Sequence, residues 1–161
     1  MTRRLDADLF LWRLVAERYA DRAFDGEGAR LYGGRWNLPG TPAVYTSTHL
    51  SLAVLELFVH LDPADAPEEM VTIPARVPAG TLVDELDVAD LPGGWRSYPA
   101  PEAVQQLGTD RLAAGKAAVL LVPSVVIPAE RNAVLDPRHA DFTTIEIGEP
   151  EEFSFDPRMW K

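Results

Sequence analysis

The chain alternates between short apolar segments and polar segments rich in proline and glycine. Apolar or alternating runs bounded by turn residues are typical of β-strands. Such runs predict strands at 8–15, 42–46, 70–77, 117–122, 142–147 and 153–155, and the fourth continues beyond Pro123 and Ser124 at 125–127. The pattern therefore favours many short elements over a few long helices.

Two segments have the composition and the ends of helices. Residues 49–61 are mostly apolar and end at Asp62 and Pro63, and the hydroxyl groups of residues 46–48 are placed to cap the first turn. Residues 101–115 begin with proline and end with glycine, which is the usual order at helix ends. We expect both segments to be helical.

The other segments have no regular pattern. Residues 16–29 suit a loop or a short broken helix, 63–69 an acidic surface loop, and 130–139 a polar loop around a short apolar patch, while 82–91 is acidic and mixed. Together the elements predict an α+β fold with about six short mixed strands and two to four flanking helices. We expect a single compact domain over residues 1–161.

Composition places the chain among globular proteins. Its 161 residues, 47 % of them apolar, are enough to bury a sizeable core. It has no cysteine, which excludes disulfides and thiolate metal sites. No apolar segment approaches the roughly 18 residues of a membrane span, and acidic residues interrupt the N-terminus before a signal-peptide core. We therefore expect a cytoplasmic protein without a membrane partner.

The formal net charge of −10 argues against direct binding of nucleic acid, because the field of the whole chain repels phosphate polymers. A few local arginines are still able to hold a small anion. An acidic surface also suits a basic protein partner, although it is more often a means of solubility. Both explanations of the charge stay open here.

The residues best suited to chemistry are concentrated between positions 28 and 61. Gly33 and Gly34 let the backbone come close to a ligand, and Arg35 offers a planar fork of donors to a pyrophosphate. The same residues also suit a tight hairpin with an exposed arginine. Glu56 is the only charged residue between positions 51 and 59, so burial of that helix would leave the carboxylate little water. A carboxylate in such a place is usually paired or used.

Three residues outside that loop and helix join the candidate set. Arg13 interrupts the first apolar strand and Tyr45 lies in the strand that follows the glycine loop. Ser124 follows a proline that must break its strand, so it either faces a site or bonds only to the backbone of a turn. His139 is a further acid–base candidate, but the three histidines are too widely spaced in the sequence to indicate a metal triad.

These residue types suit a dinucleotide whose bond to nicotinamide is broken. Patterns of serine hydrolases, cysteine nucleophiles, zinc proteases, P-loops and dinucleotide-binding glycine loops are missing from the sequence. Two arginines would neutralise a pyrophosphate, an aromatic ring would stack, and a carboxylate would stabilise an oxocarbenium-like ribose. Because the ring nitrogen of bound nicotinamide is already positively charged and becomes neutral when the bond breaks, no general acid is needed.

Five segments in order resemble the RES domain toxins of RES-Xre toxin–antitoxin modules. They are GARLYGGRWN, PAVYTSTHLSLAVLE, VPSVV, ERNAVLDPRHADF and FSFDPR, and the resemblance extends from Trp12 to Arg158. The arginine, glutamate and serine that name the family correspond to Arg35, Glu56 and Ser124. The sequence is thereby identified as similar to this family along nearly its whole length.

The resemblance implies a fold related to the ADP-ribosyltransferase toxins and an enzyme that consumes NAD as its substrate, with no metal. Position by position, it implies that Arg13 and Arg35 hold the phosphates and nearby ribose, and that Tyr45 stacks against nicotinamide. Glu56 would stabilise the ribosyl cation and grip its hydroxyl, and Ser124 would hydrogen-bond the ligand. Asp136, where the family often has asparagine, affects only the local loop.

The resemblance also implies a partner, an Xre-type antitoxin that occludes the NAD cleft with its own chain and carries the DNA-binding function. A homo- or hetero-oligomer is compatible with this. Transfer of ADP-ribose to water or another small acceptor would make the chain an NAD-degrading toxin, whereas a protein acceptor would make it an ADP-ribosyltransferase. A non-catalytic interaction module is a third alternative, against which the intact Arg35, Tyr45 and Glu56 weigh.

Overall fold

The computed structural model describes residues 1–65, 67 and 69–161, which hold nine strands, three α-helices and five 3-10 helices. The strands are β1 (Thr2–Arg4), β2 (Leu9–Ala16), β3 (Val44–Ser47), β4 (Met70–Val77), β5 (Leu82–Glu85), β6 (Val119–Pro123), β7 (Arg131–Leu135), β8 (Glu146–Ile147) and β9 (Glu151–Phe153). The α-helices are α1 (Glu27–Tyr32), α2 (Leu50–Phe58) and α3 (Glu102–Ala113). The 3-10 helices are η1 (Glu17–Arg22), η2 (Pro63–Asp65), η3 (Val88–Asp90), η4 (Ala140–Thr144) and η5 (Pro157–Trp160).

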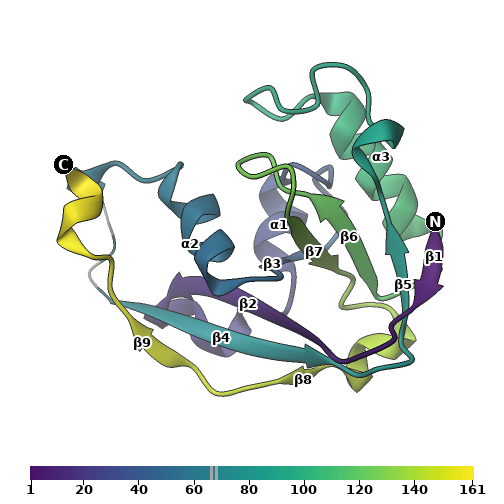
Figure 1. Ribbon diagram of the computed structural model, residues 1–161, viewed down its shortest axis with the longest axis horizontal. Helices are drawn as coiled ribbons and strands as arrows, with labels where there is room; N and C mark the ends of the chain where they lie inside the picture. The colour runs from purple at the N-terminus through teal and green to yellow at the C-terminus, as the bar shows by residue number, and fades with distance from the viewer. Residues whose placement is uncertain (66, 68) are drawn as a thin grey trace.

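All of these strands belong to one mixed sheet, shown in Figure 1. Their order is β1-β5-β6-β7-β3-β2-β4-β8, and β9 pairs with the start of β4 on the same edge as β8. β5 and β6 run parallel, and the other pairs among the described strands are antiparallel. The α+β class predicted from the sequence is confirmed.

The central strands β6 and β7 separate two hydrophobic clusters. Val119 and Leu121 of β6 contribute to one cluster, whereas Leu120 and Val122 contribute to the other. Such a division follows from the two-residue period of a strand, which sends successive side chains to opposite faces. Because both faces are covered, β6 is buried along its whole length and reads as a continuous apolar run.

The helices α2 and α3 lie over different parts of the sheet, and the turn from β6 to β7 lies between them in Figure 1. α3 packs Val104 and Leu112 into the second cluster, beside Trp36 and Trp95. α2 buries Leu52 and Ala53. Within the described ranges no helix has the length and apolar character to cross a membrane.

Much of the predicted order of elements is confirmed. The strand at 70–77 has the predicted bounds, and the strand predicted at 8–15 is present as β2. The helices predicted at 49–61 and 101–115 are present as the shorter α2 and α3. The loop predicted at 63–69 contains η2, and residues 66 and 68 of it lie outside the described residues.

Three predictions about the second half of the chain are wrong. The segment 130–139 is not a loop, because it contains the central strand β7. Residues 142–144 belong to the 3-10 helix η4, and only Glu146 and Ile147 form a strand, β8. The predicted continuation of β6 over 125–127 is a turn instead, since the Ser124 hydroxyl accepts hydrogen bonds from the amides of Val126 and Ile127.

The predicted helix cap is also wrong. Residue His49 is the N-cap of α2, and no side chain caps this helix. The hydroxyls of Thr46 and Thr48 donate instead to the carbonyl oxygens of Ala133 and Arg131 in β7. The threonine hydroxyls that were expected to cap α2 therefore bond to β7, the strand with which β3 pairs.

Substitution of Gly108 by alanine tests how closely α3 approaches the loop before β3. Alanine is ordinarily the better helix former by about 1 kcal/mol. At this position, however, its Cβ would lie 2.7 Å from the carbonyl carbon of Trp36. We expect Gly108→Ala to lower the free energy of unfolding by about 1–3 kcal/mol, as overpacking does, in urea denaturation.

Gly28→Ala in α1 is the matched control, because its Cβ would meet no atom within 4 Å. This variant should keep or slightly raise the free energy of unfolding. Equal stability of the two alanine variants would contradict the close contact between α3 and the Trp36 backbone.

Candidate functional site

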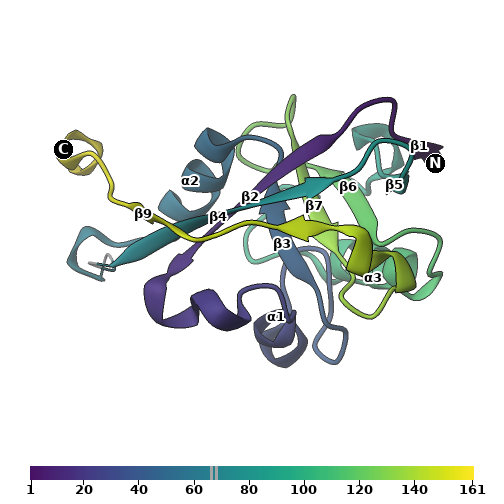
Figure 2. The same ribbon diagram turned by 90° about the horizontal axis from the view of Figure 1, so that it is seen from below.

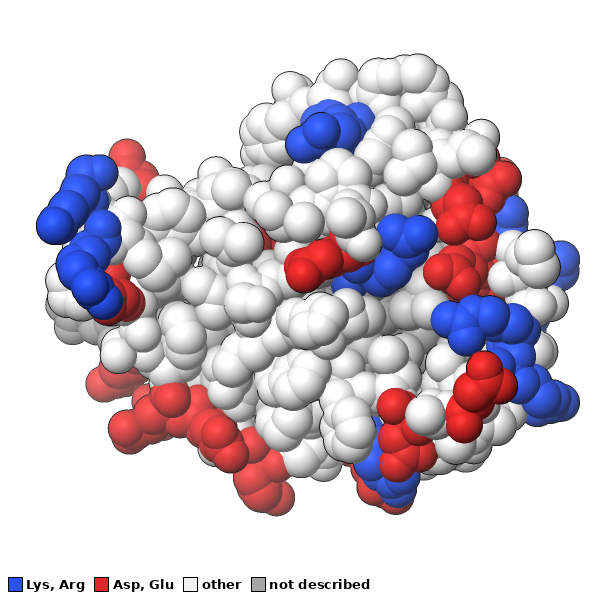
Figure 3. Space-filling model, viewed as in Figure 1, with Lys and Arg blue, Asp and Glu red and all other residues white. Residues whose placement is uncertain are grey.

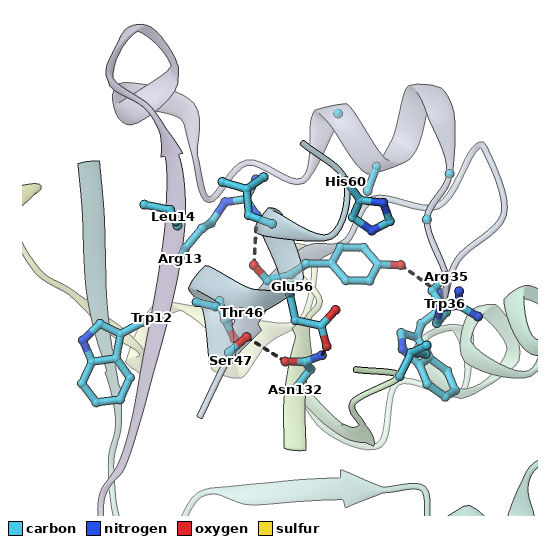
Figure 4. Close-up of a pocket in the computed structure, with 18 residues that line it drawn as sticks. Trp12, Arg13, Leu14, Arg35, Trp36, Thr46, Ser47, Glu56, His60 and Asn132 are labelled. Atoms are coloured by element: carbon cyan, nitrogen blue, oxygen red, sulfur yellow. Dashed lines mark hydrogen bonds between the residues drawn. The ribbon is translucent and has the colours of Figure 1, made fainter. Parts of the chain in front are cut away.

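A cavity of about 440 Å³ lies between α2, the β2–β3 part of the sheet and the loop that follows α1. Arg13, Arg35, Tyr45 and Glu56 all line it, although they come from four different elements or loops. Figure 4 shows these surroundings, with Glu56 between Arg13 on one side and Arg35 on the other. The fold thus brings four of the five predicted site residues to one place.

Glu56 is held by two hydrogen bonds to one of its oxygens. The Ser124 hydroxyl donates to Oε1 at 2.6 Å, and the Asn132 Nδ2 donates to the same atom at 2.7 Å. Within the described residues the other oxygen, Oε2, has no hydrogen-bond partner. The carboxylate is therefore fixed in direction and keeps one oxygen for a ligand.

Asn132 was not among the candidates drawn from the sequence. Its own amide is oriented by Ser47, whose hydroxyl donates to Oδ1 at 2.7 Å, so that Nδ2 must face Glu56. Asn132 lines the cavity and lies opposite Ser47 in the β3–β7 ladder. The apolar run at 133–135, inside the predicted loop, is the local sign of the strand that carries Asn132.

Ser124 lies behind Glu56 instead of at the cavity surface. Its residue is fully buried, and its hydroxyl accepts from the amides of Val126 and Ile127 while it donates to Glu56. The hydroxyl therefore connects the turn after β6 to the carboxylate on α2. Ser124 thus contacts Glu56, and the sequence-based expectation that it hydrogen-bonds the ligand stays a prediction.

Arg35 is held at the opposite wall by the loop 95–97. Its Nη1 donates to the carbonyl oxygens of Trp95 at 2.9 Å and Ser97 at 3.1 Å. Partial burial lowers the pKa of the Arg35 guanidinium, and the nearby Glu56 carboxylate opposes that shift. Since an arginine titrates far above neutral pH, the group is a cation facing the carboxylate.

The loop that carries Arg35 is fastened to α3. Gln105 donates to the carbonyl oxygen of Gly34 at 2.9 Å, and the Thr109 hydroxyl accepts from the amide of Leu38. Gly108 lies between these two residues on the same helix and lets the loop backbone approach. The spacing of three or four residues places all three groups on one face of α3.

Tyr45 is fixed through its hydroxyl. It donates to Oδ1 of Asn37 at 2.6 Å and accepts from the amide of Trp36 at 3.0 Å. A Cβ at Gly34 would come within 2.6 Å of this hydroxyl, so the glycine is required for the close approach of the ring. Burial raises the pKa of the Tyr45 phenol above its ordinary value, so the hydroxyl stays protonated further into the alkaline range.

Arg13 extends from β2 into the cavity. Its Nη1 donates to the carbonyl oxygen of Tyr45 at 2.9 Å, whereas its buried Nε has no hydrogen-bond partner among the described residues. Burial lowers the pKa of the Arg13 guanidinium, and the charge of Asp25 opposes this. The site thus contains a second cation whose donors are only partly used.

His139 lies outside this cavity and has a local role. Its Nδ1 accepts from the amide of Asp141 and begins η4, and its Nε2 lies 3.0 Å from the carbonyl oxygen of Gly115. Among the described residues no group of three or more His, Cys, Asp or Glu side chains is arranged to hold a metal ion.

The first cavity combines two guanidinium cations, one oriented carboxylate and a fixed aromatic ring. These groups suit an elongated ligand with anionic and planar parts.

Comparison with known proteins gives a consistent picture. The RES domain family model matches residues 10–156, a range that contains all five predicted site residues. A protein named Toxin Res from Yersinia enterocolitica is 38 % identical over 152 residues, which cover 94 % of this chain and 99 % of that protein. A protein named Prs ADP-ribosylating toxin from Sphingobium sp. is 35 % identical over 153 residues, covering 92 % of this chain and 94 % of that protein.

The fold is shared with a solved structure. A chain in the crystal structure of the M. tuberculosis MbcT–MbcA toxin–antitoxin complex superposes with a TM-score of 0.75. The match covers 98 % of this chain and 89 % of that chain at 17 % sequence identity. This protein therefore shares its overall fold with a chain of that complex.

The raised pKa of Tyr45 predicts a loss of stability at alkaline pH. In the unfolded chain a tyrosine ionises near pH 10, at about its model-peptide value, while the folded protein keeps Tyr45 protonated to higher pH. Unfolding above that pH therefore releases a proton, and the free energy of unfolding falls by up to about 1.4 kcal/mol per pH unit. Tyr45→Phe should remove this part of the slope, measured by urea denaturation at several alkaline pH values.

Tyr98→Phe is the control, because Tyr98 is 76 % exposed. It should leave the alkaline slope unchanged. The same slope in both phenylalanine variants would show that the Tyr45 phenol is not the buried group described above.

Proposed function

The chain belongs to the RES domain family, and on this premise we propose that it is the toxin of a toxin–antitoxin system that cleaves the bond between nicotinamide and ribose in NAD. The observation that carries the proposal is the oriented Glu56 carboxylate, bound at Oε1 and free at Oε2, in a cavity with two arginines. Relatives that are named as toxins, and that are similar to this chain along nearly their whole length, support the toxin part of the proposal.

In this proposal the dinucleotide lies between the two arginines, which hold its phosphates and the nearby ribose. Arg13 has an unused buried donor, and Arg35 presents its remaining donors after bonding two carbonyl oxygens. Charge-assisted hydrogen bonds from guanidinium groups to phosphate oxygens are the strong type of contact at such sites. Tyr45, whose ring is fixed at its hydroxyl, gives the nicotinamide a flat apolar surface.

Cleavage then needs no proton from the protein. The bond between ribose C1′ and the nicotinamide nitrogen breaks, and its electron pair stays on that nitrogen, which becomes neutral. Positive charge develops on the ribose, and the free oxygen of Glu56 stabilises it. Because Ser124 and Asn132 already orient the carboxylate, little reorganisation is required when the charge appears.

An acceptor completes the reaction. An oxygen of water or another small acceptor bonds to C1′ and loses its proton, and the products with water are nicotinamide, ADP-ribose and a proton. A protein acceptor is the second candidate, favoured by the relative named Prs ADP-ribosylating toxin. Mass spectrometry after incubation with NAD separates them, since labelled protein without comparable free ADP-ribose would contradict the hydrolytic version.

The proposed partner is an Xre-type antitoxin that covers the cavity with its own chain and supplies the DNA binding, in the cytoplasm. The fold shared with a chain from a toxin–antitoxin complex supports such a partner. The net charge of −10 agrees with a partner chain that binds the nucleic acid. Figure 3 shows acidic side chains gathered along the edge where β9 lies. That edge suits a basic protein surface better than a phosphate backbone.

Glu56→Gln tests the central role of the carboxylate. The amide keeps the size of the side chain but removes the charge that opposes the ribosyl cation. We expect nicotinamide release from NAD to fall about 100-fold or more, as for other lost transition-state contacts. Glu102→Gln, at the exposed start of α3, should keep the wild-type rate. A Glu56→Gln variant that folds and releases nicotinamide normally would overturn the mechanism.

Ser124→Ala tests whether this residue positions Glu56. Removal of the hydroxyl leaves the carboxylate with one of its two hydrogen bonds, so we expect kcat to fall about tenfold with little change in KM for NAD. A direct contact with the ligand would instead raise KM. The free energy of unfolding, measured alongside, separates this effect from a loss of folded protein.

A further inference from the structure

A second cavity of about 410 Å³ adjoins the first. Arg13 and Gly28 line both cavities, so the two meet at the cationic side chain on β2 and at the first turn of α1. The rest of its wall comes from η1, α1 and the turn between them, which follow the end of β2 in Figure 2. None of the residues proposed for cleavage, apart from Arg13, belongs to it.

The wall of this second cavity carries exposed planar side chains. Tyr32 is 84 % exposed at the end of α1, and Tyr19 is 43 % exposed on η1. The guanidinium of Arg22 lies 5.3 Å from the centre of the Tyr19 ring. Aromatic rings and guanidinium planes are the surfaces on which nucleobases stack, independently of base identity.

The polar groups of the wall suit a sugar. Oδ1 of Asp25 accepts from the amide of Glu27 at 2.9 Å, and its Oδ2 has no hydrogen-bond partner within the described residues. Glu27 is engaged by the guanidinium of Arg30, so its charge is already balanced. In the second cavity Asp25 therefore offers one free carboxylate oxygen to the hydroxyl groups of a sugar. It lacks the two side-chain hydrogen bonds that hold Glu56.

The junction between the cavities suits a pyrophosphate. Arg13 contributes a cation there, and its buried Nε lacks a partner, which leaves a polar group uncompensated. Each cavity alone lies near the lower end of the roughly 300–1,000 Å³ that small-molecule sites occupy. Two adjacent cavities with an arginine in the wall that they share match a ligand that is itself two nucleosides joined by a pyrophosphate.

We infer that the second cavity binds the adenosine half of NAD, with the base against Tyr19 and Tyr32 and the ribose toward Asp25. This inference rests on the proposed cleavage of NAD at Glu56. The position of Glu56 fixes the orientation of NAD, because this anchored carboxylate lies in the first cavity and the bond to be cleaved must lie beside it. The second cavity then contributes affinity and selects dinucleotides over mononucleotides, without touching the reacting bond.

The test compares two substrates with the same reacting bond. Nicotinamide mononucleotide lacks the adenosine half, so the wild type should show a KM for it at least about tenfold above the KM for NAD. The double variant Tyr19→Ala/Tyr32→Ala should raise the KM for NAD about tenfold and keep kcat, because base stacking on aromatic side chains contributes on this scale. Its constants for the mononucleotide should stay within about twofold of the wild type.

Phe10→Ala is the control for removal of an exposed ring, since Phe10 is 51 % exposed on β2 and lines neither cavity. It should leave both substrates unaffected. Equal KM values for NAD and the mononucleotide in the wild type would overturn the inference. A double variant whose KM rises equally for both substrates would also overturn the inference, because that result indicates a general structural effect.

Direct binding separates this inference from the proposed function. Titration calorimetry with adenosine monophosphate should show binding to the wild type and to Glu56→Gln, and at least about tenfold weaker binding to the Tyr19→Ala/Tyr32→Ala variant. Absence of cleavage with this binding pattern would reject the NAD chemistry and retain an adenosine site. Cleavage of NAD without any binding of adenosine monophosphate to the wild type would reject the second cavity as that site.

Discussion

The hydrogen bonds from Ser124 and Asn132 to one oxygen of Glu56 are the contact on which the arrangement of the site depends. They join α2 to the turn after β6 and to β7, two segments far from it in the sequence. A partly buried carboxylate without such donors would be costly, because its charge would lose water without replacement. The network satisfies one oxygen of the carboxylate and leaves the other available to a ligand.

The opposite wall of the cavity depends on α3. Gln105 and Thr109 bind the backbone on either side of Arg35, and Gly108 removes the side chain that would keep the loop away. Arg35 is then held by the carbonyl oxygens of the loop at 95–97. The cation is thus positioned by backbone contacts, which change little when neighbouring side chains move.

The far end of α2 is supported by the C-terminal segment. The ring of Phe58, two residues beyond Glu56, lies 5.1 Å from Trp160 and 6.3 Å from Phe155. Aromatic clusters of this geometry add stability beyond the area they bury. The sheet edge at β9 therefore delivers the last residues of the chain to the helix that carries the carboxylate, so both termini of α2 are tied to other parts of the fold.

The sequence by itself determined the α+β class, the strands at 8–15 and 70–77, and the residues Arg13, Arg35, Tyr45 and Glu56 that share the cavity, because apolar periodicity and isolated charges are local signals. It misplaced β7, since a central strand that begins with arginine and asparagine looks like a loop until its partners are known. Tertiary structure alone decided that Ser124 faces Glu56, that Asn132 joins it, and that η1 and α1 form a second cavity beside Arg13. The physical reason is that hydrogen-bond direction and cavity shape arise from contacts between segments distant in the chain, which no local pattern records.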